Sequence, residues 1–198
     1  MKTLIALTGG IGAGKSVVAR MLRTMGYPVF DCDIEARMLM DADTRIKARI
    51  AGEIAEEAIT ADGTIDRARL AAIVFADEAL LATLNTIVHG AVKERLAQWA
   101  EAQQSPVVFV ETAILYQSGL NRAVDAEWRV EAPDELRIER VMARNGISRE
   151  AVQSRIDSQN HTPAPGEPQP AVSVILNDGI EPVLPQVLRL TQQATKQK

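Results

Sequence analysis

The chain has 198 residues, 46% of them apolar, and a net charge of −4 at pH 7, which suits one globular domain with a buried core. Acidic and basic residues are mixed, which argues against a nucleic-acid partner, and the single cysteine excludes an intrachain disulfide. No uncharged apolar run reaches the roughly 18 residues of a membrane span, and the apolar stretch 4–7 is too short for a signal peptide, so we expect a cytoplasmic protein without a membrane partner.

The first thirty residues are typical of a strand, a turn, a helix and a second strand. Residues 3–7 form a short apolar run of the buried-strand type, and a glycine-rich loop follows at 8–14. We expect a helix over 15–25, ended by Gly26. Residues 28–31 are the second short strand.

After residue 33 the chain becomes rich in alanine and in charged residues at helical spacing, with few strand-forming residues. This pattern predicts several helices, broken near Asp62-Gly63, with Gly90 as a second candidate break. We expect residues 33–104 to form a helical lobe, inserted between the core segments 1–32 and 105–198.

The remaining elements restore the alternation of strands and helices. Residues 106–111 are the clearest strand, because a continuous apolar run suits a parallel strand covered on both faces. Further strands are expected at 127–131 and 172–176, and helices at 134–144, from Ser148 to about Asn160, and from 182 onward, with a proline-rich loop at 161–170. The alternation predicts an α/β fold with a five-stranded parallel sheet between helical layers.

A phosphate-binding motif stands between the first strand and the first helix. Residues 9–16 match the pattern G-x-x-x-x-G-K-[ST] in its required context. Glycines let successive backbone N–H groups curl around phosphate oxygens, and the helix beginning at Lys15 adds its positive end. Lys15 is expected between the β- and γ-phosphates and Ser16 on Mg²⁺, so the motif implies ATP and Mg²⁺. The expected nucleotide-binding residues are Gly10, Ile11, Gly12, Ala13, Gly14, Lys15, Ser16 and Val17.

The motif predicts a nucleotide but not a reaction. An N-K-x-D segment that would read guanine is missing from the sequence, which argues against a GTPase. A small-molecule kinase needs a base for the acceptor hydroxyl, and Asp33, just past the second strand, is the candidate. Two alternatives remain at this point: Asp33 could cap a helix, or Asp31 could be the active carboxylate. Glu111, at the end of its strand, is a candidate for holding the water shell of Mg²⁺.

A kinase also needs a basic lid, which we place at about 134–165. Arg137, Arg140 and Arg144 share one face of the helix expected there. They are expected to close over the transferring phosphoryl group and exclude water, whereas the alternative is a solvated basic face. The fold class is therefore a three-layer P-loop NTPase fold with an inserted helical substrate lobe and a helical lid.

Together these segments resemble the dephospho-coenzyme A kinase family over nearly the whole chain. The family segment L-T-G-G-I-G-S-G-K-S is matched from Leu7 to Ser16 with one change, at Ala13, and its D-A-D segment is similar to residues 31–33. Further similar segments are 62–67, 73–77, 137–159 and 173–179. The chain departs from the family at Gly90, where proline is usual, at 113–117, and in the proline-rich segment 161–170.

The resemblance implies ATP-dependent phosphorylation of the ribose 3′-hydroxyl of dephospho-CoA, the last step of coenzyme A synthesis. It implies that Asp33 is the base and that Lys15, Arg140 and Arg144 act with it. Thr8, Asp33 and His89 would contact the acceptor, in a monomer or small homo-oligomer. The residues by themselves leave open another small-molecule or nucleotide kinase, or a nucleotide-sensing protein that transfers nothing.

Overall fold

The structure is a computed structural model that describes residues 2–159, 166 and 168–196. The chain divides into two compact units, Met1–Phe30 with Ala102–Lys198, here called the core unit, and Asp31–Glu101, here called the helical unit. None of the helices in the described ranges combines the length and the apolar character that a membrane span requires.

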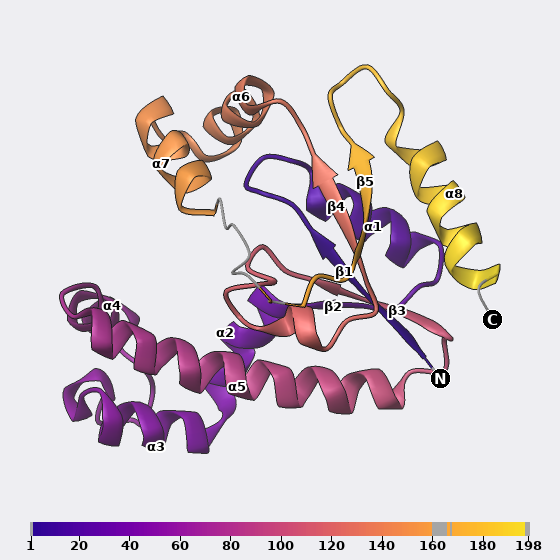
Figure 1. The fold of residues 1–198 in the computed structure, drawn as a ribbon. Helices are drawn as coiled ribbons and strands as arrows, with labels where there is room; N and C mark the ends of the chain where they lie inside the picture. Colours follow the sequence, from indigo (N-terminus) through magenta and orange to yellow (C-terminus); the bar gives the residue numbers. More distant parts are fainter. Residues whose placement is uncertain (1, 160–165, 167, 197–198) are drawn as a thin grey trace. The chain divides into compact units, whose positions relative to one another are not determined.

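The core unit is built on one sheet of five strands (Figure 1). Their spatial order is β2 (Val29–Asp31), β3 (Val107–Glu111), β1 (Thr3–Thr8), β4 (Ala126–Glu131) and β5 (Ala171–Leu176). The central strand β1 runs parallel to both neighbours, with Leu7 opposite Glu111 and Thr8 opposite Arg129. The predicted α/β fold with a five-stranded parallel sheet is confirmed.

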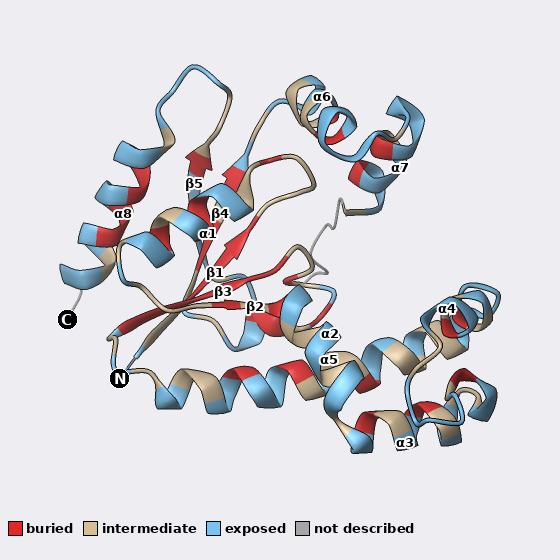
Figure 2. Ribbon diagram, turned by 180° about the vertical axis from the view of Figure 1, so that it is seen from behind, coloured by how far each residue is buried: buried red, intermediate tan, exposed pale blue. Residues whose placement is uncertain are grey.

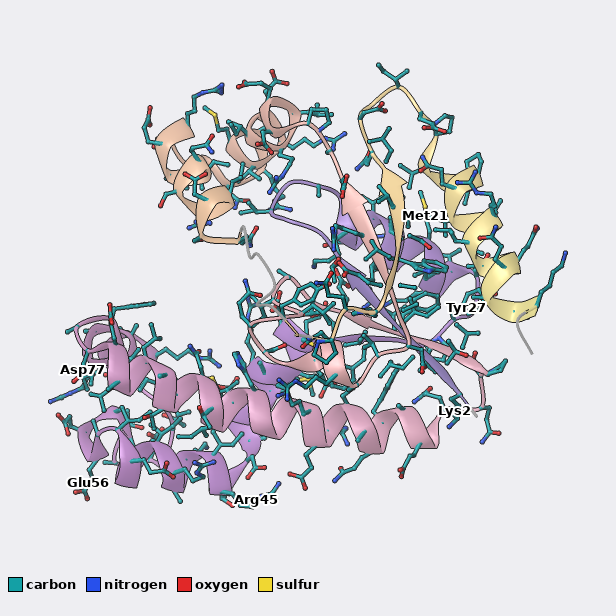
Figure 3. The ribbon with its side chains drawn as sticks, viewed as in Figure 1. Lys2, Met21, Tyr27, Arg45, Glu56 and Asp77 are labelled. Atoms are coloured by element: carbon teal, nitrogen blue, oxygen red, sulfur yellow. The ribbon has the colours of Figure 1, made fainter. Side chains whose placement is uncertain are left out.

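The strands and two helices share an apolar core. Helix α1 (Lys15–Thr24) contacts β1 and β3, and α8 (Val183–Lys196) contacts α1 and β5. All five residues of β3 are buried, as its continuous apolar run predicts, and Figure 2 shows buried residues along β1, β3 and β4. Met21 and Tyr27 pack at the margin of this core (Figure 3), where Tyr27 meets Phe109 edge to face at 5.6 Å.

Two short helices follow β4 and pack on each other. Helix α6 (Asp134–Asn145) ends at Gly146, which adopts a φ of 64°, and α7 (Arg149–Gln159) begins after Ser148, whose hydroxyl accepts a hydrogen bond from the Ala151 N–H at 3.3 Å. Their apolar contact consists of Ile138, Val141, Val152 and Ile156, with Ile11 of the glycine loop packed against it. The predicted end of this helix at Asn160 and most of the predicted loop 161–170 lie outside the described residues.

The helical unit contains α2 (Cys32–Ala42), α3 (Thr44–Glu53), α4 (Arg67–Phe75) and most of α5 (Glu78–Ala102). Two short 3₁₀ turns complete the elements, Glu56–Ala58 in this unit and Leu120–Arg122 in the core unit. The predicted break at Asp62-Gly63 is present as a turn in which Gly63 adopts a φ of 77°.

The candidate break at Gly90 was wrong, because α5 runs through it without interruption. A glycine inside a helix costs about 1 kcal/mol relative to alanine. Ile87 and Val92, on either side of Gly90, are buried. Their burial stabilises the helix by more than the glycine costs, since each buried apolar side chain contributes about 1.5–3 kcal/mol.

Candidate active site

The loop between β1 and α1 has a shape that only glycine allows. Gly9, Gly12 and Gly14 adopt φ angles of 147°, 80° and 102°. A Cβ atom added at Gly12 would lie 2.5 Å from the carbonyl oxygen of Arg137, and one added at Gly14 would lie 2.1 Å from Nδ2 of Asn177. The loop is therefore closely surrounded. Apart from the N–H groups of Ile11 and Ala13, which donate to Gln159 and to the Gly10 carbonyl, its backbone N–H groups can bind a phosphate group.

Helix α1 begins where the loop ends. Its N-cap is Gly14, and no side chain among the described residues caps it. The first N–H groups of the helix and its positive end therefore remain available to an anion. Ser16 and Val17 are exposed on the first turn. The oxygen of Ser16, together with phosphate oxygens, suits Mg²⁺, which takes few protein ligands in nucleotide sites.

Polar side chains from distant segments hold the loop in place. The Arg137 Nε donates to the Ile11 carbonyl at 3.0 Å, and the Ile11 N–H donates to Oε1 of Gln159 at 2.7 Å. At the end of β5, the amide of Asn177 donates to the Ala13 carbonyl at 2.8 Å. Arg140 donates to the Asn177 carbonyl at 3.1 Å, so that α6, α7 and β5 all fix the loop.

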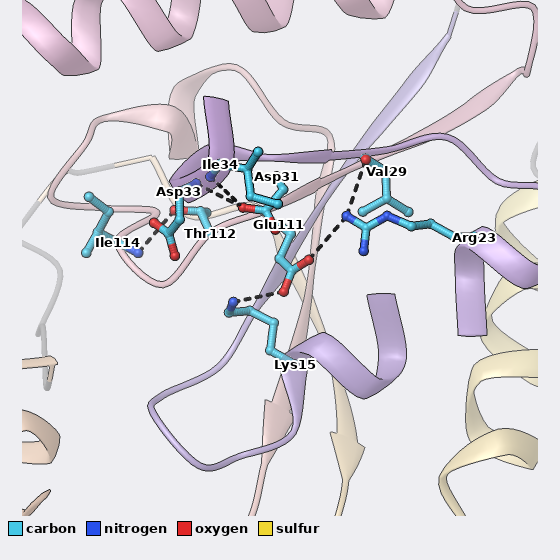
Figure 4. Close-up of polar contacts among 9 residues, drawn as sticks. All are labelled: Lys15, Arg23, Val29, Asp31, Asp33, Ile34, Glu111, Thr112 and Ile114. Carbon is cyan, nitrogen blue, oxygen red and sulfur yellow. Dashed lines mark hydrogen bonds and ion pairs between the residues drawn. The ribbon is translucent and has the colours of Figure 1, made fainter. Parts of the chain in front are cut away.

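Lys15 projects from α1 to the end of β3. Its ammonium nitrogen lies 3.1 Å from Oε1 of Glu111, and Nη2 of Arg23 lies 3.5 Å from Oε2 of the same carboxylate (Figure 4). The Glu111 side chain is only 4% exposed. Glu111, expected near Mg²⁺, is thus the partner of two cations, and the described residues contain no cluster of three or more acidic, histidine or cysteine side chains that could hold a metal.

Asp31 and Asp33 have different roles in the local structure. The Asp31 carboxylate accepts hydrogen bonds from the N–H groups of Asp33 and Ile34, both at 3.0 Å, and so caps α2 (Figure 4). The alternative in which Asp33 is the cap was wrong, because an N-cap precedes the helix and Asp33 lies in its first turn. The Asp33 carboxylate is exposed.

The predicted arginines differ in position. Arg140 is half-buried and bound to Asn177, whereas Arg144 is exposed and donates to Oδ1 of its neighbour Asn145 at 2.9 Å. Both Arg137 and Arg140 contact the loop directly, Arg137 at the Ile11 carbonyl at 3.0 Å and Arg140 at the Gly12 carbonyl at 3.5 Å. In the helical unit, burial and then the charge of Lys93 lower the pKa of His89, which favours a neutral imidazole.

A cavity of about 550 Å³ lies beside the loop within the core unit, and this volume suits a small-molecule ligand. Its wall includes Thr8, Gly10, Tyr116, Glu127, Arg129 and Arg137. Sequence reasoning assigned no role to Glu127 or Arg129. The available signal was their spacing, since residues two apart in a strand point to the same face.

Comparisons with known proteins identify the family of this chain. The family model described as dephospho-CoA kinase matches residues 3–181. The dephospho-CoA kinase of Porphyromonas gingivalis is 38% identical over 188 residues, covering 95% of this chain and 92% of the relative. That of Thermobifida fusca is 40% identical over 175 residues, covering 88% and 86%.

Solved structures give the same result for the fold. The crystal structure of TT1252 from Thermus thermophilus is 32% identical with a TM-score of 0.76, covering 98% of this chain and 96% of that one. Dephospho-CoA kinase from Campylobacter jejuni, at 21% identity and a TM-score of 0.67, shares the fold over 99% and 98% of the two chains. The chain therefore belongs to the dephospho-CoA kinase family.

Proposed function

We propose that this protein transfers the γ-phosphoryl group of ATP to the ribose 3′-hydroxyl of dephospho-CoA, which completes coenzyme A. The observation that carries the proposal is the loop of residues 9–14, here called the glycine cradle, in a chain of this family. Three of the glycines in this loop adopt positive φ angles. A cradle of backbone N–H groups at a helix N-terminus binds phosphate, and membership of a kinase family makes that phosphate a transferable one.

The nucleotide is held by the loop residues 10–17. Lys15 exchanges its contact with Glu111 for the β- and γ-phosphates, and the Ser16 hydroxyl binds Mg²⁺. When bound, Mg²⁺ neutralises charge on the phosphates. The buried position of Glu111 and its pairing with Arg23 support this role for Lys15, because the carboxylate keeps one cation when the lysine turns to ATP.

Asp33 accepts the proton of the acceptor hydroxyl, an effect worth roughly 10²–10⁴ in rate. Three features support it over Asp31: its carboxylate is exposed, it follows β2 by two residues, and Asp31 is engaged as the helix cap. The carboxyl ends of parallel strands meet at one edge of a sheet, where ligands of open α/β folds bind.

The remaining residues bind and enclose the reactants. We assign Thr8 and His89 to the acceptor, residues 33–104 to an acceptor-binding lobe, and residues 134–165 to a lid. Arg140 and Arg144 steady the transferring phosphoryl group, and closure keeps water from replacing the alcohol. The protein acts in the cytoplasm as a monomer or small homo-oligomer, without a nucleic-acid or membrane partner, which its composition supports.

The test is to incubate the protein with ATP, Mg²⁺ and a panel of alcohol acceptors, and to weigh the products by mass spectrometry. We expect dephospho-CoA to gain one phosphate in preference to nucleosides and nucleoside monophosphates. If another compound of the panel is phosphorylated in preference, that compound is the acceptor and the assignment of dephospho-CoA is wrong. Slow ATP hydrolysis without any phosphorylated product would indicate a nucleotide-sensing protein instead.

A further inference from the structure

A buried carboxylate lies in the wall of the cavity beside the phosphate loop. The side chain of Glu127 is 1% exposed, yet it does not belong to the nucleotide cradle. Its Oε1 accepts hydrogen bonds from the Thr8 hydroxyl at 2.6 Å and from Arg129 Nε at 2.9 Å. Its Oε2 accepts from the Tyr116 hydroxyl at 2.7 Å and from Arg129 Nη2 at 3.1 Å. Each carboxylate oxygen of Glu127 therefore accepts two hydrogen bonds.

This network keeps a charge in a place where charge is unfavourable. Burial by itself raises the pKa of Glu127, but three hydrogen-bonding side chains outweigh it and hold the pKa below its ordinary value. Burial, followed by the hydrogen bond to Glu127, raises the pKa of Tyr116 to about 12, so Tyr116 keeps its donor proton. Glu127 is buried while its partner Arg129 is partly exposed, and a buried charge of this kind in a cavity wall points to a functional use.

The cavity wall carries the carboxylates of Glu127 and Glu131 and two cations, Arg129 and Arg137. The Nε and Nη2 of Arg129 donate to Glu127, and its guanidinium also interacts with the Tyr116 hydroxyl. Among residues 2–159, 166 and 168–196, its Nη1 donates to no acceptor beyond this cluster. The Arg129 side chain is 39% exposed and lines the cavity. Arg137 lines it too, but Arg137 is tied to the Ile11 carbonyl and to Asp134. Arg129 is therefore oriented by its carboxylate and still has a donor to offer.

The position of the cavity distinguishes the two substrates. Its wall includes Thr8, Gly9, Gly10 and Ala13, so it adjoins the loop, but it includes neither Lys15 nor Ser16, which are assigned to the β- and γ-phosphates. The wall also has apolar patches such as Leu115. A ligand there faces the entry to the loop from the side of β3 and β4, which suits the acceptor.

We propose that Arg129 binds a phosphate group of the acceptor, and that Glu127 and Tyr116 are positioning residues that hold its guanidinium toward the cavity. Arginine suits this task because its planar fork can bind a carboxylate along one edge and present another edge to a phosphate. The inference rests on the proposed function, since dephospho-CoA carries the phosphate groups concerned.

The first experiment measures KM separately for dephospho-CoA and for ATP. We expect Arg129→Gln to raise KM for dephospho-CoA by about tenfold or more, the size of one lost charge-assisted hydrogen bond, with KM for ATP changed less than about twofold. Arg129→Lys should have a KM for dephospho-CoA between those of the wild type and Arg129→Gln. An ammonium group keeps the positive charge but cannot bind Glu127 and a phosphate along two edges as a guanidinium does. Arg189→Gln, at an exposed position on α8, is the matched control and should behave like the wild type.

The second experiment tests positioning by a double-mutant cycle. Tyr116→Phe removes one hydrogen bond to Glu127, and we expect KM for dephospho-CoA to rise about threefold. If Tyr116 acts through Arg129, the same substitution in the Arg129→Gln background should raise KM no further. A purely structural role for Tyr116 would instead raise KM by the same factor in both backgrounds. That result would contradict the claim that Tyr116 positions Arg129.

These outcomes are distinct from a failure of the proposed function. If the wild type leaves dephospho-CoA unphosphorylated, the function itself is wrong. If the wild type phosphorylates it and Arg129→Gln, still folded by its melting curve, keeps its KM for dephospho-CoA, only the inference is overturned. A rise confined to KM for ATP would place Arg129 at the nucleotide and would overturn it as well.

Discussion

The ammonium nitrogen of Lys15 lies 3.1 Å from Oε1 of Glu111, the last residue of β3. The pair joins the first turn of α1 to the end of the neighbouring strand, and both side chains are largely shielded from water. The contact keeps the lysine extended beside the loop before a phosphate arrives. It also stabilises the fold, and this role can be separated by mutation from the proposed role of Lys15 in binding ATP.

We expect Lys15→Ala to weaken ATP binding by at least about tenfold and to reduce turnover with it, because a charge-assisted contact to phosphate is lost. The variant should also melt at a lower temperature, since Arg23, at 3.5 Å, is then the one cation left beside Glu111 among the described residues. Titration calorimetry and thermal melting measure the two effects.

A double variant separates those two roles. Lys15→Ala combined with Glu111→Gln should recover part of the lost stability, because no unbalanced carboxylate remains buried. It should not recover ATP affinity. Arg20→Ala, at an exposed position on the same helix, is the control and should change neither quantity. Recovery of ATP binding in the double variant would mean that Lys15 acts only through Glu111.

Gly12 and Gly26 form a matched pair for testing the cradle. Both adopt a left-handed φ, 80° and 86° respectively. Alanine at either position should cost about 1–2 kcal/mol of stability for that conformation. Only at Gly12 would the new Cβ meet another atom, 2.5 Å away, whereas nothing lies within 4 Å at Gly26.

We therefore expect Gly12→Ala to abolish measurable ATP binding and Gly26→Ala to leave the affinity unchanged. Equilibrium binding of ATP, with melting temperatures of both variants, checks this. Equal affinities in the two variants would show that the shape of the loop at Gly12 does not matter for the nucleotide.

Asp33→Asn should retain ATP binding and lower kcat by at least about 10²-fold, the low end for a lost general base. Asp31→Asn is the matched control, because asparagine caps helices as well as aspartate does and α2 should remain intact. Single-turnover kinetics with bound ATP isolate the chemical step. A large loss in Asp31→Asn together with a normal rate in Asp33→Asn would exchange the two roles.

Glu127 should make stability depend on pH in the acid range. Its pKa in the folded protein lies below the ordinary value of 4.5, so its contribution is fully present above that pH and is lost as the pH falls through the folded pKa. We expect Glu127→Gln to flatten the fall in melting temperature between about pH 5 and pH 3. Glu139→Gln, on the exposed face of α6, should leave the slope as in the wild type.

The local signals of the sequence predicted most of the core unit. The loop motif and the helix starting at Lys15 were correct, because glycines, a lysine and a serine at fixed spacing permit one backbone path between a strand and a helix. The strands at 106–111 and 172–176 were correct within one residue, since a buried parallel strand needs a continuous apolar run.

Features that depend on distant contacts were not predicted. The continuity of α5 through Gly90 depends on the burial of Ile87, which packs with residues of other helices, and of Val92, and a local pattern does not contain this burial. The network around Glu127 depends on the register of β1 against β4, which brings Thr8 beside Arg129 across more than a hundred residues. A glutamate and an arginine in a strand look like an exposed face until that register is known.

Phosphorus NMR of the purified protein with ATP, Mg²⁺ and dephospho-CoA follows the transferred phosphate itself. We expect a new phosphomonoester signal from the ribose 3′ position, growing in step with ADP at one per molecule of ATP consumed. ADP that forms with inorganic phosphate and without the phosphomonoester signal would contradict the proposed transfer.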